Sequence, residues 1–142
     1  MKLTELETFL TELPDVEREE NFGYLFFFVG DDHRLPFTTI GIADNDFDKV
    51  SNLDREGVFR LNIGVSKETF ENVIGDSASE DGEGVEDVDY SVLNVFLPHP
   101  HYARQSWVCI LNPEGDNVEE TKRLILEAHS IANRRMRRKA KG

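Results

Sequence analysis

The chain has 142 residues, and its 28 acidic and 16 basic side chains give a formal net charge of −12. This length is that of one domain, residues 1–142, and a content of 39% hydrophobic residues is typical of a protein with a packed core. No apolar run approaches the roughly 18 residues of a membrane span, and we expect no signal peptide. These features exclude a membrane protein, a disulfide scaffold and a multidomain machine, and they predict a cytoplasmic protein without a membrane partner.

Positive charge is concentrated at the C-terminus. Residues 134–142 hold six basic side chains and no acid, so all 28 acids lie in the rest of the chain. A body this negative repels nucleic acid, and any nucleic-acid binding through the basic tail 134–142 is expected to be weak and sensitive to salt. Cations at the end of a helix also offset the helix dipole, and we favour this interpretation of the tail.

The first elements are predicted to be a helix and a loop. Leucines recur at intervals of three and four residues over 3–13, which is the pattern of an amphipathic helix. Thr4 and Glu7 have the spacing of a capping box, and Pro14 is expected to end the helix. Residues 15–21 are predicted to form an acidic loop.

Three strands are predicted next. The segment 22–29 is almost entirely apolar, which is typical of a strand covered on both faces, and 37–43 is expected to pair with it in an antiparallel hairpin. A polar loop over 44–57 leads to a third strand, 58–63. Alternation along this strand places Arg60 on the face opposite to its apolar side chains.

The rest of the chain is predicted to hold helices and one further strand. Ser66 is a favourable N-cap for a helix over 67–74. The acidic segment 76–89 is expected to be a flexible loop. Residues 92–97 have helical spacing, with a strand near 88–96 as the alternative.

The final elements are a predicted strand at 107–111, which would bury Cys109, and a helix over 117–137. The order α-β-β-β-α-(α or β)-β-α predicts an α+β fold. An antiparallel sheet of four or five strands is expected, with the first and last helices on the same face.

A candidate ligand-binding site follows from the polar side of the third strand. Arginine binds carboxylate or phosphate groups, and asparagine can orient a ligand. The segment after residue 98 could add an amphipathic wall. The candidate residues are therefore Arg60, Asn62, His99, Tyr102, Arg104 and Trp107. A structural polar network with partly buried aromatic side chains is the alternative, and it is the more usual meaning of such a cluster.

Two histidines, His99 and His101, are separated by one residue. In an extended segment both side chains point to one side and could bind one zinc-like divalent ion. Two ligands do not make a site, so no cofactor is expected, with these two histidines as the weak metal candidates. The loop that contains Asp48 begins like an EF-hand but lacks its glycine and glutamate, which argues against calcium. No phosphate-binding glycine loop or nucleophilic serine motif is present.

Three blocks of the sequence have a specific spacing: GVFRLNIGV at 57–65, LPHPHYA at 97–103, and Trp107-Val108 followed by Leu111-Asn112-Pro113. They resemble the bacterial and archaeal family called domain of unknown function 6194. The resemblance covers about residues 22–135 and implies no known activity.

A looser similarity is to the YjbR/MmcQ-like proteins, which share a Phe-Arg-Leu strand, a strand near Trp107 and a long final helix. It implies an α-β(3)-α-β(2)-α arrangement and a DNA-binding function. The strongly negative body of this chain departs from that function. Arg60, Asn62, His99, Tyr102 and Trp107 match the family motifs, which give them no established role.

The function predicted from the sequence is that of a non-enzymatic module that binds a small molecule or a protein. The alternative is a metal-dependent or histidine-based enzyme that uses His99 and His101. A third possibility is weak nucleic-acid binding through the basic tail 134–142.

Overall fold

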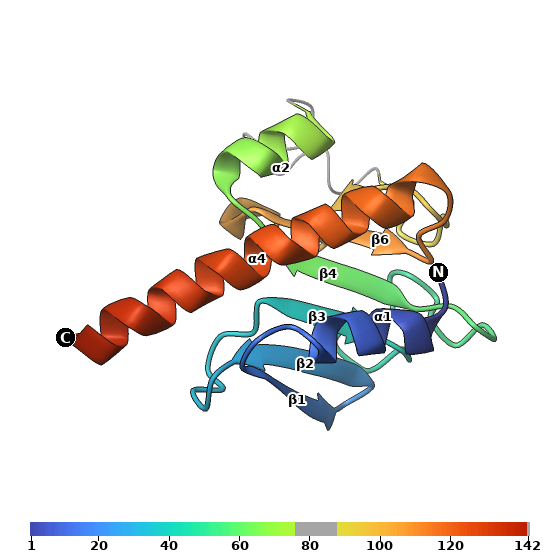
Figure 1. The fold of residues 1–142 in the computed structure, drawn as a ribbon. Coiled ribbons are helices and arrows are strands. Elements are labelled where there is room, and N and C mark those ends of the chain that lie inside the picture. Colours follow the sequence, from blue (N-terminus) through green and yellow to red (C-terminus); the bar gives the residue numbers. More distant parts are fainter. Residues whose placement is uncertain (76–87, 142) are drawn as a thin grey trace.

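The computed structural model describes residues 1–75 and 88–141 (Figure 1). The helices and strands run in this order: α1 Leu3–Thr11, β1 Val16–Asn21, β2 Tyr24–Val29, β3 Thr38–Gly41, β4 Arg60–Gly64, α2 Lys67–Ile74, β5 Leu97–Pro98, the 3₁₀ turn η2 Ala103–Gln105, β6 Trp107–Leu111 and α4 Asp116–Lys141. Most of the acidic segment 76–89 lies outside the described residues. None of the described helices combines the length and apolar character needed to cross a membrane.

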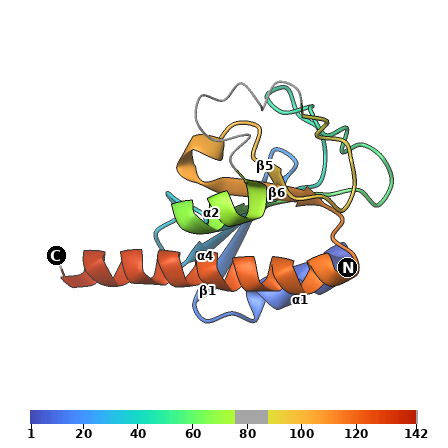
Figure 2. The ribbon, with the colours of Figure 1, turned by 90° about the horizontal axis from the view of Figure 1, so that it is seen from above.

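The strands form one antiparallel sheet in the order β1-β2-β3-β4-β6-β5. The α+β class is confirmed, with six strands in place of the four or five expected. Helices α1 and α4 cover the same face, as predicted, and the loops of the chain gather on the other face (Figure 2). Helix α2 shares the core of the first face through the buried Phe70. The last turns of α4 extend beyond the sheet (Figure 1).

The main core lies between the sheet and the helices. Alternate residues of each strand point into it, as the period of two along a strand requires. Leu25 and Phe27 come from β2, Leu61 and Ile63 from β4, and all four are almost completely buried. The remaining side chains of these strands point to the face that carries no helix.

Strand β1 corrects the acidic loop predicted at 15–21. All its residues pair with β2, from Val16 opposite Val29 to Asn21 opposite Tyr24. Its side chains are mostly exposed because β1 is an edge strand, and charged side chains at an edge hinder pairing with other chains. The tight turn at Phe22 and Gly23, with φ of 54° and 79°, fixes the hairpin register.

The helix predicted from the spacing in 92–97 is absent. Asn94 has a left-handed φ of 61°, which interrupts any helix, and Val92 and Leu93 are exposed. The segment instead follows the end of β6, where the Asn94 backbone N–H donates to the carbonyl oxygen of Leu111 at 2.6 Å. The short strand β5 begins only at Leu97, so the alternative of a strand near 88–96 is wrong as well. Pro98 fits there because β5 is an edge strand.

Two helix starts gave different outcomes. Helix α1 begins at Leu3, before Thr4, and the backbone N–H of Lys2 donates to the Glu5 carboxylate, so Thr4 and Glu7 do not form the predicted capping box. Helix α2 has the predicted bounds, and Ser66 Oγ accepts a hydrogen bond from the Thr69 backbone N–H at 3.1 Å.

Candidate functional site

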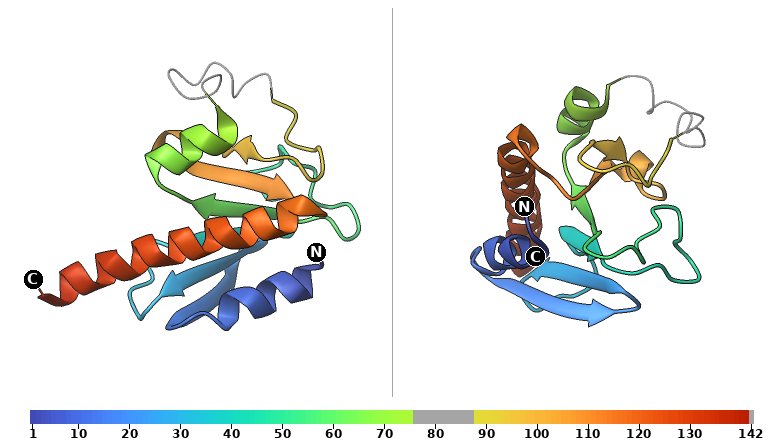
Figure 3. Two further views of the ribbon diagram at one scale, coloured as in Figure 1. Left: turned by 45° about the horizontal axis from the view of Figure 1, so that its top comes forward. Right: turned by 90° about the vertical axis from the view of Figure 1, so that its right-hand side faces the viewer.

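Loops cover the helix-free face of the sheet (Figure 3). Side chains of these loops and of the sheet line a cleft. Its volume is about 570 Å³. Most of its lining is apolar, and it is built around six aromatic side chains: Phe22, Tyr24, Phe26, Phe47, Tyr102 and Trp107. We call it the aromatic cleft. Its size is within the range of small-molecule sites in proteins.

Arg60 lies beneath the aromatic cleft and is completely buried. All five of its N–H donors are used. Nε donates to Asn62 Oδ1 at 3.0 Å, and Nη1 donates to Ser51 Oγ at 3.0 Å and Asp48 Oδ1 at 3.2 Å. Nη2 donates to Asp48 Oδ2 at 2.5 Å and to the Tyr24 hydroxyl at 2.9 Å. The guanidinium therefore has no donor left for a ligand, and it holds two cleft residues in place.

Asp48 forms the charged partner of Arg60. Besides the two contacts from Arg60, its carboxylate accepts a hydrogen bond from the Tyr24 hydroxyl. Burial acts to raise the pKa of Asp48, but hydrogen bonds and positive charge from Arg60 outweigh it and lower the pKa below its usual range. The pair is thus fully ionised at neutral pH, with opposite charges that offset each other under the cleft.

His99 begins the turn after β5 and lines the aromatic cleft while remaining 4% exposed. Its Nδ1 accepts hydrogen bonds from the backbone N–H groups of His101 at 3.0 Å and Tyr102 at 3.1 Å. Burial, together with the positive charge of Arg60, lowers the pKa of His99 to about 3. At neutral pH the ring is therefore uncharged, with its proton on Nε2.

The candidates from the sequence take different places around the cleft. His99, Tyr102 and Trp107 line it together with His101, whereas Arg60 and Asn62 lie beneath it in the polar network. Arg104 is exposed on η2 and is not among the lining residues.

Several lining residues were not predicted as part of a site. Tyr24 and Phe26 occupy alternate positions of β2, opposite to the core residues, and the apolar run at 22–29 gave only a weak signal for them. Thr39 and Asp48 are brought in by strand pairing and by the return of the 44–57 loop. No local pattern in the sequence indicates either contact.

The histidine pair shows no complete metal site in the described structure. His99 and His101 have ring centroids 5.9 Å apart, and His99 Nδ1 is occupied by backbone donors. Within residues 1–75 and 88–141, no three His, Cys, Asp or Glu side chains gather as a metal ion would need. His101 Nε2 lies 3.9 Å from Asp48 Oδ2, which is its contact with the polar network.

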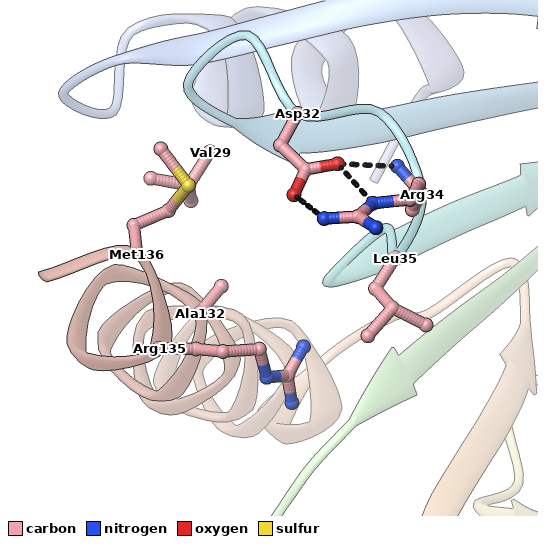
Figure 4. Close-up of a pocket in the computed structure, with 7 residues that line it drawn as sticks. All are labelled: Val29, Asp32, Arg34, Leu35, Ala132, Arg135 and Met136. Carbon is pink, nitrogen blue, oxygen red and sulfur yellow. Dashed lines mark hydrogen bonds and ion pairs between the residues drawn. The ribbon is translucent and has the colours of Figure 1, made fainter. Parts of the chain in front are cut away.

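A second, much smaller cavity lies on the other side of the loop after β2 (Figure 4). Its volume is about 30 Å³, close to the space of one water molecule. Asp32 and Arg34 form a two-point ion pair on the loop, and Met136 and Arg135 face it from α4. Arg34 also lines the aromatic cleft, so this loop separates the cleft from the C-terminal half of α4. The small cavity has no room for an organic ligand.

Gly64 fixes the position of Trp107 at the cleft. The two residues are paired across β4 and β6, and a Cβ atom at Gly64 would lie 2.8 Å from Trp107 Cε2. We expect Gly64→Ala to displace the indole, to shift its fluorescence maximum and to lower the free energy of unfolding by about 1–3 kcal/mol. Urea unfolding followed by fluorescence measures both, because Trp107 is the only tryptophan.

Gly57→Ala is the matched control for that experiment. A Cβ there meets nothing within 4 Å, but the φ of 74° strains any other residue. It should cost about 1 kcal/mol and leave the emission maximum of Trp107 unchanged. Equal emission and stability in Gly64→Ala and the wild type would contradict the crowding at Gly64.

The comparisons with known proteins identify a family and no activity. Neither the curated proteins nor the solved structures contain a match to the chain. The looser similarity to YjbR-like proteins is not shown by these comparisons. One family model matches residues 1–141, and its description is a family of unknown function, DUF6194. The match covers nearly the whole chain, and the protein therefore belongs to the DUF6194 family.

Proposed function

We propose that this protein is a binding module that holds a small, largely apolar organic molecule in the aromatic cleft. The observation that carries the proposal is the cleft itself: about 570 Å³, with a mainly apolar lining built around six aromatic side chains and a few fixed polar groups at its floor. Apolar walls supply affinity, and a small number of placed polar groups supply orientation, which is the usual design of a small-molecule site.

The exposed aromatic side chains at the rim support this function. Phe22, Phe47 and Tyr102 are 73%, 88% and 55% exposed. Large apolar side chains exposed together at one cleft contribute little to the stability of the protein, and such patches commonly mark binding surfaces. A ligand seated among them would remove their apolar area from water.

Binding is better supported than catalysis by the histidine pair. His99 uses Nδ1 to accept two backbone hydrogen bonds, and its lowered pKa keeps it neutral, so it is a poor proton acceptor at physiological pH. The Asp48 carboxylate is occupied by Arg60 and Tyr24. His101 is the remaining group for acid–base work, and its contact with Asp48 is long, at 3.9 Å.

A titration with the neutral planar dye Nile red tests the proposal, because the dye fluoresces when it leaves water. We expect saturable binding to the wild type, and about tenfold weaker binding to the double variant Phe47→Ala/Tyr102→Ala, since both rings lie on the cleft wall. Quenching of Trp107 should follow the same binding curve.

Leu126→Ala is the control for this titration. Leu126 is also an exposed apolar side chain, at 49%, but it lies on α4, on the opposite face of the sheet. The control should bind the dye as the wild type does. Non-saturable binding, or equal affinity in the wild type and the double variant, would overturn the proposal.

A further inference from the structure

We propose that the aromatic cleft selects a neutral, planar ligand whose hydrogen-bond acceptor, such as a ring carbonyl, contacts the His99 and Thr39 donors at the cleft floor. This inference rests on the proposed binding function and names the class of ligand. Two features of the cleft floor support it: two donors have no partner in the described part of the protein, and the carboxylate already accepts hydrogen bonds.

His99 supplies the first donor. Its Nδ1 accepts from two backbone N–H groups, so the proton of the neutral ring is on Nε2. In the described part of the chain, Nε2 has no hydrogen-bond partner, although the side chain lines the cleft and is 96% buried. A donor in a nearly buried side chain that has no protein acceptor is available to a ligand, and a ligand acceptor would complete its hydrogen bonding.

Thr39 supplies the second donor from the neighbouring part of the floor. Its Oγ1 accepts a hydrogen bond from Asn62 Nδ2 at 3.0 Å, which leaves the hydroxyl proton free to donate. No acceptor for this proton is found among residues 1–75 and 88–141, and Thr39 lines the cleft. The Asn62 amide, itself held by Arg60, therefore orients the hydroxyl toward a donor role.

The Asp48 and Tyr24 oxygens at the floor already accept hydrogen bonds. Asp48 accepts from Arg60 through both oxygens and also from Tyr24, and the Tyr24 oxygen accepts from Arg60. A ligand that brings only donors would have to share the Asp48 carboxylate, which already accepts three hydrogen bonds, and would leave the His99 and Thr39 donors without an acceptor. The floor therefore discriminates in favour of a ligand that brings an acceptor.

The charges around the cleft favour a neutral ligand. Arg60 is paired with Asp48, and Arg34 is paired with Asp32 through two hydrogen bonds. A charged ligand would lose its hydration in a mainly apolar cleft without gaining an unpaired counter-charge from either pair. The aromatic rings of Tyr24, Phe26 and Trp107 suit a flat molecule, since they contact its faces with little loss of side-chain entropy.

Two bicyclic probes of similar size test the inference at pH 7.5: 1-indanone, which carries a carbonyl acceptor, and indole, which carries an N–H donor. Binding is measured from chemical-shift changes in NMR spectra of the labelled protein. We expect 1-indanone to bind about fivefold or more tightly than indole, and to shift the ¹⁵N resonance of His99 Nε2. Both ligands are small, so millimolar affinities are expected.

The variant His99→Asn provides the matched test. Asparagine can keep an acceptor near the position of Nδ1 for the two backbone N–H groups, but it lacks the ring N–H. We expect the preference for 1-indanone to fall to about twofold or less, with the affinity for indole unchanged. The comparison of the two probes on the wild type remains decisive if the variant folds poorly.

The results that would contradict the choice of ligand class differ from those that would contradict the binding function. Equal binding of both probes in the cleft would overturn the choice of ligand class and leave the binding function standing. A preference for indole would do the same. Absence of binding by both probes, with Nile red also unbound, would overturn the binding function and this inference together.

Discussion

Replacing Arg60 with methionine is expected to lower the free energy of unfolding by about 3–5 kcal/mol, which is the usual cost of removing one partner of a buried ion pair. Arg60 is completely buried, and Asp48 is nearly so. Without the guanidinium, the Asp48 carboxylate would remain in a poorly hydrated place with Tyr24 as its main side-chain donor. Asn62, Ser51 and Tyr24 would each lose a hydrogen-bond donor as well.

Urea unfolding of three variants separates this explanation from a general effect of the substitution. Arg123→Met removes an exposed arginine paired with Glu120 and should change stability by about 0.5 kcal/mol or less. The double variant Arg60→Met/Asp48→Asn removes the uncompensated charge and should be more stable than Arg60→Met alone. A loss below about 1 kcal/mol in Arg60→Met would show that the network contributes little.

The stability of this network bears directly on the cleft. Arg60 touches no ligand in our proposal, because all its donors are used. It acts by holding Asp48 and Tyr24, and through Asn62 it holds Thr39. A substitution of Arg60 is therefore expected to weaken binding by displacing the residues of the cleft floor. Substitutions that lower the free energy of unfolding more should also weaken binding more.

The local part of the fold could be predicted from the sequence. Apolar periodicity predicted α1 and α4, a continuous apolar run predicted β2, and a capping serine predicted α2 with its observed bounds. Strand β1 was missed because its side chains are exposed and charged, and its strand geometry comes from the backbone pairing with β2. The helix predicted at 92–97 failed because spacing alone does not show that Val92 and Leu93 have no core to pack against.

The sequence could predict only those parts of the site that depend on residues close together in the chain. Alternation correctly placed Arg60 and Asn62 on the face opposite to Leu61. Whether they are exposed or buried on that face depends on which segments cover it. The cover comes from the 44–57 loop, which precedes β4 and folds back over it, and from the segment after β5, which is remote in sequence. The pairing of Asp48 with Arg60 follows from that tertiary contact, and no spacing rule indicates it.

The contribution of His99 to the stability of the protein is expected to fall as the pH drops from 6.5 toward 5, because His99 cannot take up a proton in the folded state. Its pKa is about 3 when folded and about 6.5 when unfolded. Between these values the unfolded state binds one proton more than the folded state. The free energy of unfolding should therefore decrease by about 1.4 kcal/mol per pH unit from this group alone.

Two other groups change stability with pH in known directions. The pKa of His33 is raised, because its ring nitrogens contact Glu19 and Glu17, so its contribution is present at low pH and is lost as the pH rises through the folded pKa. The pKa of Asp48 is lowered, so its contribution is lost only at acidic pH, below its usual value. Between pH 6.5 and 5, His33 thus adds stability while His99 removes it. The contribution of His99 has to be separated from that of His33 by substitution.

Comparing the wild type with His99→Asn isolates the His99 contribution, since His33 and Asp48 are present in both proteins. The variant should be the less stable protein at pH 7.5, because it loses ring contacts with Tyr102 and Trp107. That difference in the free energy of unfolding should shrink by about 2 kcal/mol at pH 5. The wild type loses stability because its unfolded state takes up a proton on His99, and the variant has no histidine at this position. Urea unfolding at pH 7.5, 6.0 and 5.0 measures the change, and NMR of the ring should show no titration of His99 in this range. If the free energies of unfolding of the two proteins instead changed equally with pH, and His99 titrated near pH 6.5, the ring would be hydrated in the folded state. Its Nε2 donor would then be bound to water rather than left without an acceptor.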